Sequence, residues 1–411
     1  MIYVLVKDQK RSGGFMAKQI RNNVYWIGKV DWELRRFHGD ELSTHRGSTY
    51  NSYLIKEEKT VLIDTVWAPF SPEFLRELPK EVALEKIDAV IVNHGEVDHS
   101  GAMTDLMRHI PGVPVYCTPN AVKSLKGHYH QDWNFKPVRT GDTLDIGNGK
   151  ALTFIEAPML HWPDTMFTYL SGDNILFSND AFGQHLATDK LFADCIDPLI
   201  VQEEEIKYYA NILAPWSKLV AAKLKEIKKL NLPIEMICTS HGACWRRDIG
   251  KVLAKYESWA NAYKENRITI AYDSMWGGTR AMAEAIARGI RMADAEVELA
   301  VHSLARSDKN DVMTDMFRSK AVLIGSPSHN KCALASVGAV IEELRGLAFQ
   351  GKKAAAFGCY GWSGEAQARL TAILGEIGFD VVDAGIKNMW EPDGAALDAC
   401  VEYGKQFAVK V

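Results

Sequence analysis

Six consecutive residues of this sequence include four side chains that can bind a metal. His94, Glu96, Asp98 and His99 lie in the run HGEVDH, directly after the apolar stretch Ala89–Val92. We expect that stretch to be a buried strand, so the run begins where the strand opens into a loop. Side chains alternate past the end of a strand, so the first three can converge, and the turn that follows can aim His99 at a second metal. The run therefore predicts a metal site at a strand end.

Three further candidate ligands follow other apolar stretches. His161 comes after Leu152–Ala157, Asp180 after Ile175–Ser178 and His241 after Met236–Thr239. A single histidine or aspartate at a strand end is usually an ordinary loop residue, but seven candidates in matching positions are poorly explained in that way. Imidazole and carboxylate ligands without thiolates suit iron, manganese or zinc, and a carboxylate such as Asp180 can bridge two ions. The sequence thus predicts a site for two metals.

A separate loop suits a phosphate. It consists of Ser274, Met275, Trp276, Gly277, Gly278 and Thr279, between an expected strand and an expected helix. Free backbone N–H groups and the helix dipole converge at such a loop and favour an anion. An ordinary capped start of a helix is the alternative interpretation of the same residues.

The elements that must position these residues follow two patterns. Residues 24–254 contain many short apolar runs typical of buried strands, with helices between them. Strands are expected over Thr49–Ile55, Val61–Asp64, Pro114–Cys117 and Glu235–Thr239, and two later helices over Glu203–Leu230 and Lys251–Lys264. The polar stretch Glu265–Arg267 then marks a domain boundary.

After this boundary, strands and helices alternate regularly. Strands are expected over Ile268–Tyr272, Glu296–Ser303, Ala321–Gly325, Lys353–Gly358 and Asp380–Ala384, and helices over Thr279–Met292, Ala335–Arg345, Glu365–Glu376 and Asp393–Ala408. Five strands that alternate with helices predict a doubly wound parallel sheet. Such sheets bind ligands at the carboxyl ends of their strands, which is where the loop at residues 274–279 lies.

The composition of the whole chain limits the class of protein. Its 411 residues suggest two or three domains, and 47% apolar with 24% charged residues is typical of globular proteins. A net charge of -4 gives no reason to expect nucleic-acid binding. No apolar run approaches the roughly 20 residues of a membrane span. The seven cysteines form no Cys-x-x-Cys pair, which fits a cytoplasmic protein and excludes a four-cysteine iron module within this chain.

The order of the seven candidate ligands resembles that of the metallo-β-lactamase-like αββα fold. Most members of that superfamily have a histidine where this chain has Glu96, and the glutamate variant resembles the flavodiiron (A-type flavoprotein) family, whose site binds two irons. A hard carboxylate in place of an imidazole favours iron over zinc. The resemblance implies one iron held by His94, Glu96 and His161, and another held by Asp98, His99 and His241. Asp180 and a solvent oxygen would bridge the two irons.

Residues 266–411 resemble flavodoxin, whose phosphate loop for FMN is similarly rich in hydroxyl groups. In flavodoxin-like folds, two later loops flank the isoalloxazine ring and supply backbone N–H groups and an aromatic cover. Here those loops contain Ser326, Pro327, Ser328, His329 and Asn330, then Tyr360, Gly361, Trp362, Ser363 and Gly364. The resemblance therefore implies a flavodoxin-like FMN domain at 266–411, after a metallo-β-lactamase-like di-iron domain at 16–265.

A flavin and two irons in one chain imply an oxidoreductase. The resemblance implies reduction of O2 to water, or of two NO to N2O and water, with electrons that arrive through FMN. Because no four-cysteine iron module is present in this chain, it implies a separate donor, rubredoxin, and a rubredoxin:oxygen oxidoreductase or nitric oxide reductase activity. It also implies a head-to-tail homodimer, or a dimer of such dimers, with the FMN of one subunit near the irons of the other. Trp362 would then lie near both cofactors.

Two other functions compete with this one. A metallo-hydrolase that uses metal-bound hydroxide, with an attached flavodoxin domain, would also need a metal site at strand ends, but Glu96 and the flavodoxin loops favour the redox enzyme. An electron-transfer flavoprotein with a docking domain would leave the seven ligands unexplained. Three residues beside the expected site have weaker claims. His185 and Tyr208 could line the oxidant pocket, although we expect His185 at the surface, and Trp162 serves packing or function equally well.

The first fifteen residues, Met1–Phe15, carry no expected chemistry. They are too short and too polar for a good signal peptide, and a second possible start follows at Met16. The Arg-Ser-Gly-Gly run before Met16 could be an encoded ribosome-binding site, so we interpret this extension as translated upstream sequence or a short disordered tail.

Overall fold

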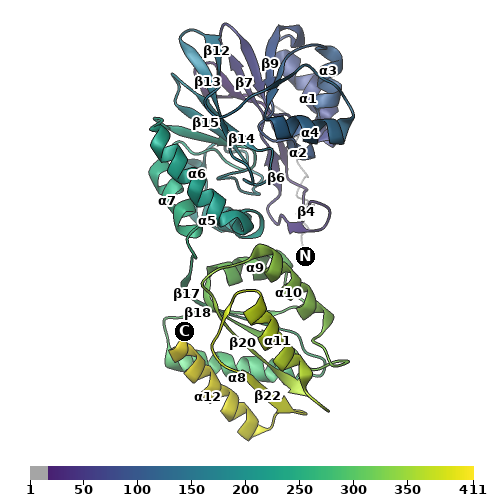
Figure 1. Cartoon of the computed structure of the whole chain (residues 1–411), viewed down its shortest axis with the longest axis vertical. Helices are drawn as coiled ribbons and strands as arrows, with labels where there is room; N and C mark the ends of the chain where they lie inside the picture. The colour runs from purple at the N-terminus through teal and green to yellow at the C-terminus, as the bar shows by residue number, and fades with distance from the viewer. Residues whose placement is uncertain (1–16) are drawn as a thin grey trace, which may run out of the picture. The chain divides into compact units, whose positions relative to one another are not determined.

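The computed structural model describes residues 17–411, so the expected N-terminal extension lies outside the described residues. The chain forms two compact units (Figure 1). Among the described residues, the first contains 17–35, Thr44–Val201 and Leu232–Ile249, and the second contains Arg36–Ser43, Gln202–Asn231 and Gly250–Val411. The domain boundary between residues 265 and 266 stays a prediction. Within residues 17–411, no helix is both long and apolar enough to cross a membrane.

The first unit is built around two sheets that share one core. One has the order β1-β2-β7-β8-β9-β10-β11, with β1 at Lys18–Arg21, β2 at Val24–Trp26, β7 at Tyr53–Lys56, β8 at Thr60–Ile63, β9 at Ile87–Ile91, β10 at Val115–Cys117 and β11 at Phe135–Pro137. The other has the order β12-β13-β14-β15-β16, with β12 at Thr143–Gly147, β13 at Lys150–Glu156, β14 at Met166–Leu170, β15 at Ile175–Asn179 and β16 at Met236–Thr239. Buried apolar side chains of both sheets pack together, among them Ile55, Ile63, Phe154 and Phe177. This two-sheet sandwich agrees with the fold that the family resemblance implied.

Short helices connect these strands. They are α1 (Ser71–Glu77), α2 (Val97–Ser100), α3 (Met103–His109) and α4 (Pro119–Tyr129). A small ladder also joins β3 (Lys29–Asp31) to β6 (Ser48–Tyr50), and another joins β4 (Arg36–Phe37) to β5 (Leu42–Ser43). Helix α2 begins directly after Glu96, so it carries Asp98 and His99 on its only turn.

Two expectations for the N-terminal part were wrong. The expected strand Thr49–Ile55 is divided into β6 and β7, because Asn51 between them bonds to another loop: its side chain donates to Thr239 O at 2.8 Å and to Gly242 O at 3.0 Å. The expected helix Glu203–Leu230 is also interrupted. Helix α5 (Pro198–Tyr208) passes into a π-helical turn and a 3₁₀ turn before α6 (Ser217–Leu230). Pro215 lies in that interruption, and proline cannot donate the hydrogen bond that a continuous α-helix requires.

The second unit contains the predicted doubly wound sheet. Its order is β18-β17-β19-β20-β21, with β17 at Glu265–Tyr272, β18 at Glu298–Ser303, β19 at Ser319–Gly325, β20 at Lys353–Tyr360 and β21 at Asp380–Val381. All of these pairs are parallel. If these five strands are numbered in chain order, their order across the sheet is 2-1-3-4-5. The chain therefore changes the direction in which it adds strands between β17 and β19. Ligands of such sheets bind at that switch point.

Helices cover this sheet, and the predicted α/β fold class is confirmed. They are α8 (Gly278–Ala293), α9 (Lys309–Arg318), α10 (Ala335–Leu347), α11 (Glu365–Glu376) and α12 (Gly394–Lys410), while α7 (Ile249–Trp259) precedes β17. Helices α8 and α12 pack against each other and against the sheet core (Figure 1). Helix α9 was not predicted, and helix α7 ends at Trp259, five residues before the predicted end at Lys264.

The fifth strand differs from its expected form. Instead of one strand over Asp380–Ala384, β20 pairs with β21 and then with β22 (Ile386–Met389). Between them Asp383 accepts a hydrogen bond from Gly385 N at 2.8 Å and another from the Tyr403 hydroxyl at 2.8 Å. This local turn, of the kind that aspartate favours, interrupts the strand and extends the chain to Trp390 beside the carboxyl end of β20.

Candidate metal centre and nucleotide site

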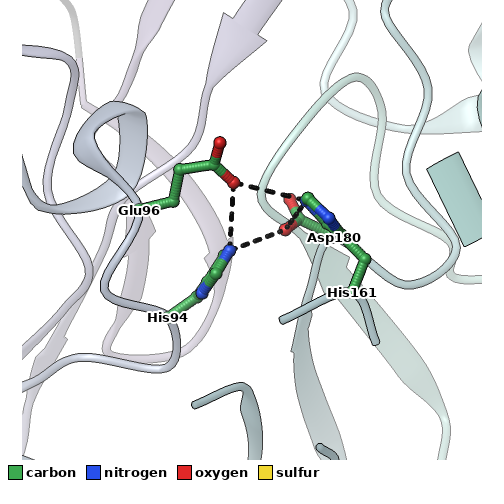
Figure 2. Close-up of side chains that lie close together, drawn as sticks. All are labelled: His94, Glu96, His161 and Asp180. Atoms are coloured by element: carbon green, nitrogen blue, oxygen red, sulfur yellow. Dashed lines mark hydrogen bonds and ion pairs between the residues drawn. The ribbon is translucent and has the colours of Figure 1, made fainter. Parts of the chain in front are cut away.

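One group of four ligand side chains meets at the ends of the strands in the first unit (Figure 2). His94 Nε2 lies 3.1 Å from Glu96 Oε2 and 3.6 Å from Asp180 Oδ2. His161 Nε2 lies 3.3 Å from the same Glu96 oxygen and 3.4 Å from the same Asp180 oxygen. The four ligand atoms all lie within 4.8 Å of one another. Such an arrangement can surround a single cation.

A second group lies on the other side of Asp180. His99 Nε2 is 3.3 Å from Asp98 Oδ2 and 3.1 Å from Asp180 Oδ1. His241 Nε2 is 3.1 Å from Asp98 Oδ2 and 3.6 Å from Asp180 Oδ1. One carboxylate oxygen of Asp180 therefore faces the first group and the other oxygen faces the second. The structure brings all seven predicted residues together, in two groups joined by one carboxylate.

The burial and charge of these side chains fit metal ions. Both carboxylate oxygens of Asp98 and the Oδ2 atom of Asp180 are buried, and none of them accepts a hydrogen bond from the part of the chain that the structure describes. Glu96 is also buried, at 6% exposure. Three buried carboxylates close together are costly unless cations compensate them. Each group offers two imidazoles and one carboxylate besides Asp180, a donor set typical of non-haem iron.

Other residues hold the imidazoles in place from behind. His94 Nδ1 lies 2.7 Å from Asp164 Oδ1, and His241 Nδ1 donates to Thr49 O at 2.6 Å. Ser240 Oγ donates to Asp180 Oδ1 at 2.7 Å. A hydrogen bond at the far nitrogen fixes the tautomer and the orientation of a metal-binding histidine. Both rings therefore turn Nε2 toward the group of ligands.

The charges of the cluster shift several pKa values. Burial alone would lower the pKa of His99, but the nearby charges of Asp98 and Asp180 raise it to about 9. Burial opposes the charge on His94 as well, yet its bonds to Asp164 and Glu96 raise its pKa well above the usual value. Burial would raise the pKa of Asp164, but the hydrogen bond from His94 lowers it overall. The carboxylates of the cluster thus favour positive charge at His94 and His99.

Pairing between strands explains why distant residues meet here. Strands β15 and β16 are parallel neighbours, so Asp180 and His241, which follow them, emerge at the same edge. Asp64, which follows β8, accepts from Asn93 N at 2.7 Å, and burial raises the pKa of this carboxyl to about 6. That bond holds the chain that leads from β9 into His94. Asp64 and Asp164 were not among the predicted site residues, although Asp164 follows His161 in the run HWPD.

The expectation that His185 lies at the surface was wrong. His185 is only 6% exposed, its Nδ1 lies 3.0 Å from Ser48 Oγ, and its ring centroid lies 5.0 Å from that of His241. Its loop folds inward because Ala187 N donates to Arg46 O at 2.9 Å. Trp162 also contacts the cluster, with its ring edge-on to His94 at 5.1 Å between centroids. Tyr208 is buried in the second unit.

The predicted nucleotide loops meet in the second unit. They follow β17, β19 and β20, and they surround two adjoining cavities of about 640 and 360 Å³. The predicted residues that line these cavities are Ser274, Met275, Trp276, Gly278, Thr279, Pro327, Ser328, His329, Asn330, Tyr360, Gly361, Trp362 and Ser363. Trp276 and Trp362 are each 87% exposed, so two large aromatic rings stand open at the rim. The space and the aromatic lining fit a flat ring system such as a flavin.

The phosphate end of this site is shaped by the start of α8. Gly277 N donates to Ser274 Oγ at 3.1 Å, which keeps the loop tight before the helix begins at Gly278. A Cβ atom on Gly278 would lie 2.9 Å from Cys359 Sγ, so only glycine leaves this approach open. Of the other predicted residues, Ser326 is buried and its Oγ accepts from Leu334 N at 2.9 Å, and Gly364 precedes α11.

Five cavity-lining residues were not predicted. They are Lys331, Cys359, Glu365, Trp390 and Glu391. Trp390 and Glu391 reach the site only because the fifth strand is divided, and no local pattern in the sequence predicted that division. Lys331, Cys359 and Glu365 directly border the predicted loops, so slightly longer loop boundaries would have included them.

Comparisons with known proteins match both parts of the chain. The family described as "ODP family beta lactamase" matches residues 49–242, and the flavodoxin family matches residues 270–404. The anaerobic nitric oxide reductase flavorubredoxin of Aeromonas hydrophila is 52% identical over 394 residues, which cover 96% of this chain and 79% of that protein. The same-named protein of Klebsiella pneumoniae is 51% identical, over 96% of this chain and 82% of its own length.

Solved structures also resemble the whole chain. The rubredoxin oxygen:oxidoreductase of Desulfovibrio gigas superposes with a TM-score of 0.92 at 32% identity, over 96% of this chain and 98% of that one. The flavodiiron protein of Giardia intestinalis superposes with a TM-score of 0.91 at 35% identity, over 96% of each chain.

Proposed function

Because the chain belongs to the flavodiiron protein family, we propose that it is an oxidoreductase that takes electrons from rubredoxin and reduces NO to N2O or O2 to water, with FMN and two irons as its cofactors. One observation carries this proposal: the two oxygens of Asp180 face two separate groups of ligands. A carboxylate placed in this way can join two metal ions. The relatives that match both domains are named as reductases, which leaves no support for the hydrolase alternative.

The ligand assignment follows the two groups. His94, Glu96 and His161 would hold one iron, whereas Asp98, His99 and His241 would hold the other. Asp180 would contribute to both. When bound, FMN would carry electrons one at a time and the irons would supply them in pairs to a diatomic substrate.

The protein's own contribution is to fix these ligands and to keep water out. Asp164 accepts a hydrogen bond from His94 Nδ1, and Thr49 O accepts one from His241 Nδ1. The Nε2 lone pairs of both rings therefore point at the metal positions. Ser240 holds Asp180 Oδ1 in place between the two groups. The burial of the carboxylates strengthens their attraction for a cation, because the local dielectric constant is low.

The similarity to named relatives favours NO as the main substrate. The flavorubredoxins at 52% and 51% identity are named nitric oxide reductases, whereas the oxygen-reducing protein of Desulfovibrio gigas is 32% identical. Reduction of NO consumes two electrons and two protons for each N2O and each water formed from two NO. Reduction of one O2 to two waters consumes four electrons and four protons. We propose O2 as the second substrate, after NO.

We further propose that rubredoxin is the electron donor. The relative from Aeromonas hydrophila is longer than this chain, which spans 79% of its length. The seven cysteines of this chain form no Cys-x-x-Cys pair, and a rubredoxin iron needs four thiolates. The four thiolates of a rubredoxin iron would therefore lie outside these 411 residues.

A head-to-tail homodimer, alone or as a pair of dimers, completes the proposal. Trp276 and Trp362 are each 87% exposed and Trp390 is 61% exposed, so the rim of the FMN cavity presents a large aromatic surface. Exposed apolar patches of this kind mark interaction sites. In a head-to-tail dimer, Trp362 of one subunit would lie near the irons of the other. Dilution to the monomer should abolish turnover while FMN and iron remain bound, and full activity in a proven monomer would refute the dimer.

Anaerobic rapid mixing tests the function directly. Protein reduced by a stoichiometric amount of reduced rubredoxin is mixed with NO or with O2, and the return of the oxidised flavin absorbance is followed. We expect reoxidation by both gases, faster with NO, and N2O in the headspace after the NO reaction. A colourless protein that contains zinc and hydrolyses esters or amides would contradict the proposal.

A further inference from the structure

Two cysteines face each other across the base of the loop that carries His241. Cys238 belongs to β16, and Cys244 lies on the segment that returns from the loop. Ile237 and Trp245 form an antiparallel bridge in which each N–H donates to the other residue's carbonyl at 2.8 Å. The next pair toward the loop is Cys238 opposite Cys244. Because pairs alternate in an antiparallel ladder, these two residues form no backbone hydrogen bonds with each other. In antiparallel ladders the Cα atoms of such pairs are about 4.5 Å apart, within the range that a disulfide spans.

The two thiols also meet in the interior. Each thiol shifts the pKa of the other, and both residues have 0% exposure. Tyr53 Oη lies 3.3 Å from Cys244 Sγ and donates to Thr239 O at 2.5 Å. This bond holds the first residue of the loop beside the thiol pair. No redox step or ligand role in the proposed function uses either cysteine.

We propose that Cys238 and Cys244 are a dithiol that hydrogen peroxide converts into a reversible disulfide, which closes the loop around His241. The interaction with Cys238 lowers the pKa of the Cys244 thiol, whereas burial raises the pKa of Cys238, so Cys244 is the attacking sulfur. Its thiolate attacks one peroxide oxygen, the O–O bond breaks, and a sulfenic acid and one water form. Cys238 sulfur then displaces the hydroxyl group as a second water. Two thiols and one peroxide thus give one disulfide and two waters, and the two electrons pass from sulfur to oxygen.

The position of this pair gives the disulfide a role beside the metal centre. The ring that it closes, residues 238–244, contains His241, whose Nδ1 is already held by Thr49 O. A disulfide is uncharged and suits the apolar core in which both cysteines lie. Oxidation of one thiol alone to a sulfinic acid would bury a charge there instead. The pair therefore consumes one peroxide without placing a charge in the core, and a thiol reductant can return the disulfide to the dithiol.

Peptide mapping tests the proposal. The full-length protein with its cofactors is exposed to a small excess of hydrogen peroxide, quenched with catalase, alkylated after unfolding and digested with trypsin. Both cysteines fall in one tryptic peptide, Leu230–Arg246, which contains no other cysteine. We expect this peptide to become two hydrogen atoms lighter and to take up no alkyl group. Treatment of the oxidised protein with dithiothreitol before alkylation should restore both alkylation sites.

Three cysteines of the same chain serve as controls. Cys117 is also buried, so its peptide should remain alkylated, whereas the exposed Cys195 and Cys332 report that the oxidant was present. In Cys238→Ala, Cys244 should stop at the sulfenic acid, which dimedone traps. The proposal fails if peptide Leu230–Arg246 still carries two alkyl groups once Cys195 and Cys332 are oxidised. Sulfinic acid on either cysteine of the unsubstituted protein, without the disulfide, would overturn it as well.

Discussion

Replacement of Asp164 by asparagine tests how much of the metal affinity depends on the support behind His94. Asp164 Oδ1 lies 2.7 Å from His94 Nδ1, and the two side chains are 1% and 0% exposed. Asp164 Oδ2 also accepts from Gly95 N at 3.1 Å. Asparagine keeps the size of the side chain and one acceptor oxygen, but it removes the charge. The substitution therefore weakens the bond to the imidazole and leaves the backbone contact in place.

Two independent estimates give the size of the effect. A hydrogen bond to a charged group contributes about 1.5–3 kcal/mol. Loss of a residue that orients a metal-binding histidine typically costs about 10–100-fold in metal affinity. At about 1.36 kcal/mol for each tenfold change, this loss corresponds to about 1.4–2.7 kcal/mol. The two ranges agree, so we expect Asp164→Asn to weaken one of the two metal sites by 10- to 100-fold.

Competition with a chelator of known affinity measures this change under anaerobic conditions. Asp173→Asn is the matched control, because Asp173 is also a buried aspartate and pairs with Lys150 at 2.6 Å. Both variants lose a buried ionic contact, but only Asp164 contacts a metal-ligand candidate. We expect Asp173→Asn to retain both metals at the original affinity. Equal metal affinity in Asp164→Asn and the original protein would refute the reasoning.

Three further predictions address other parts of the molecule. Asp180→Asn should lower the iron content below two per chain without loss of FMN, because Asp180 alone faces both groups of ligands; metal analysis and flavin absorbance of one sample decide this. Gly278→Ala should weaken FMN binding at least about tenfold and leave iron unchanged, since the added Cβ would lie 2.9 Å from Cys359 Sγ; flavin titration of the apoprotein measures it. Burial lowers the pKa of Lys352 to about 7, and its ammonium donates to Tyr263 O and Phe317 O, with Lys264 and Glu265 as the nearest charges. Between pH 7 and 10 the unfolded chain holds a proton at this site that the folded chain has lost, so the free energy of unfolding should rise with pH by about 1.4 kcal/mol per unit. Urea unfolding at several pH values should show a flatter dependence in Lys352→Met, and identical slopes would contradict the assignment.

The sequence predicted which side chains gather at the strand ends, because the candidate ligands lie shortly after apolar runs. His94, Asp180 and His241 need only the rule that buried strands open into loops, and that rule is local. The division of the seven residues into two groups came from the family resemblance, since no spacing shows which oxygen of Asp180 faces which imidazole. The supporting contacts depend on tertiary structure. Asn51 bonds to Thr239, 188 residues further along the chain, and no local pattern predicts such a partner.

The same limit explains the errors in the fold. The run TYNSYLI has the composition of one strand, but the bonds that Asn51 makes to a distant loop divide it. Asp383 divides the fifth strand of the second unit through bonds to Gly385 and Tyr403. That division brings Trp390 and Glu391 to the FMN cavity, so one missed turn also hid two site residues. The expected surface position of His185 is wrong because its loop folds inward onto Ser48, a contact that no local pattern predicts.

The most direct test of the account is a metal and flavin count combined with Mössbauer spectroscopy on one anaerobic preparation. If Asp180 joins the two groups of ligands, the protein reconstituted with iron should contain two irons and one FMN per chain. The two irons should then give the spectrum of a magnetically coupled pair, and Asp180→Asn should lose that coupling. A single iron per chain, or two irons without coupling in the original protein, would contradict the two-metal site.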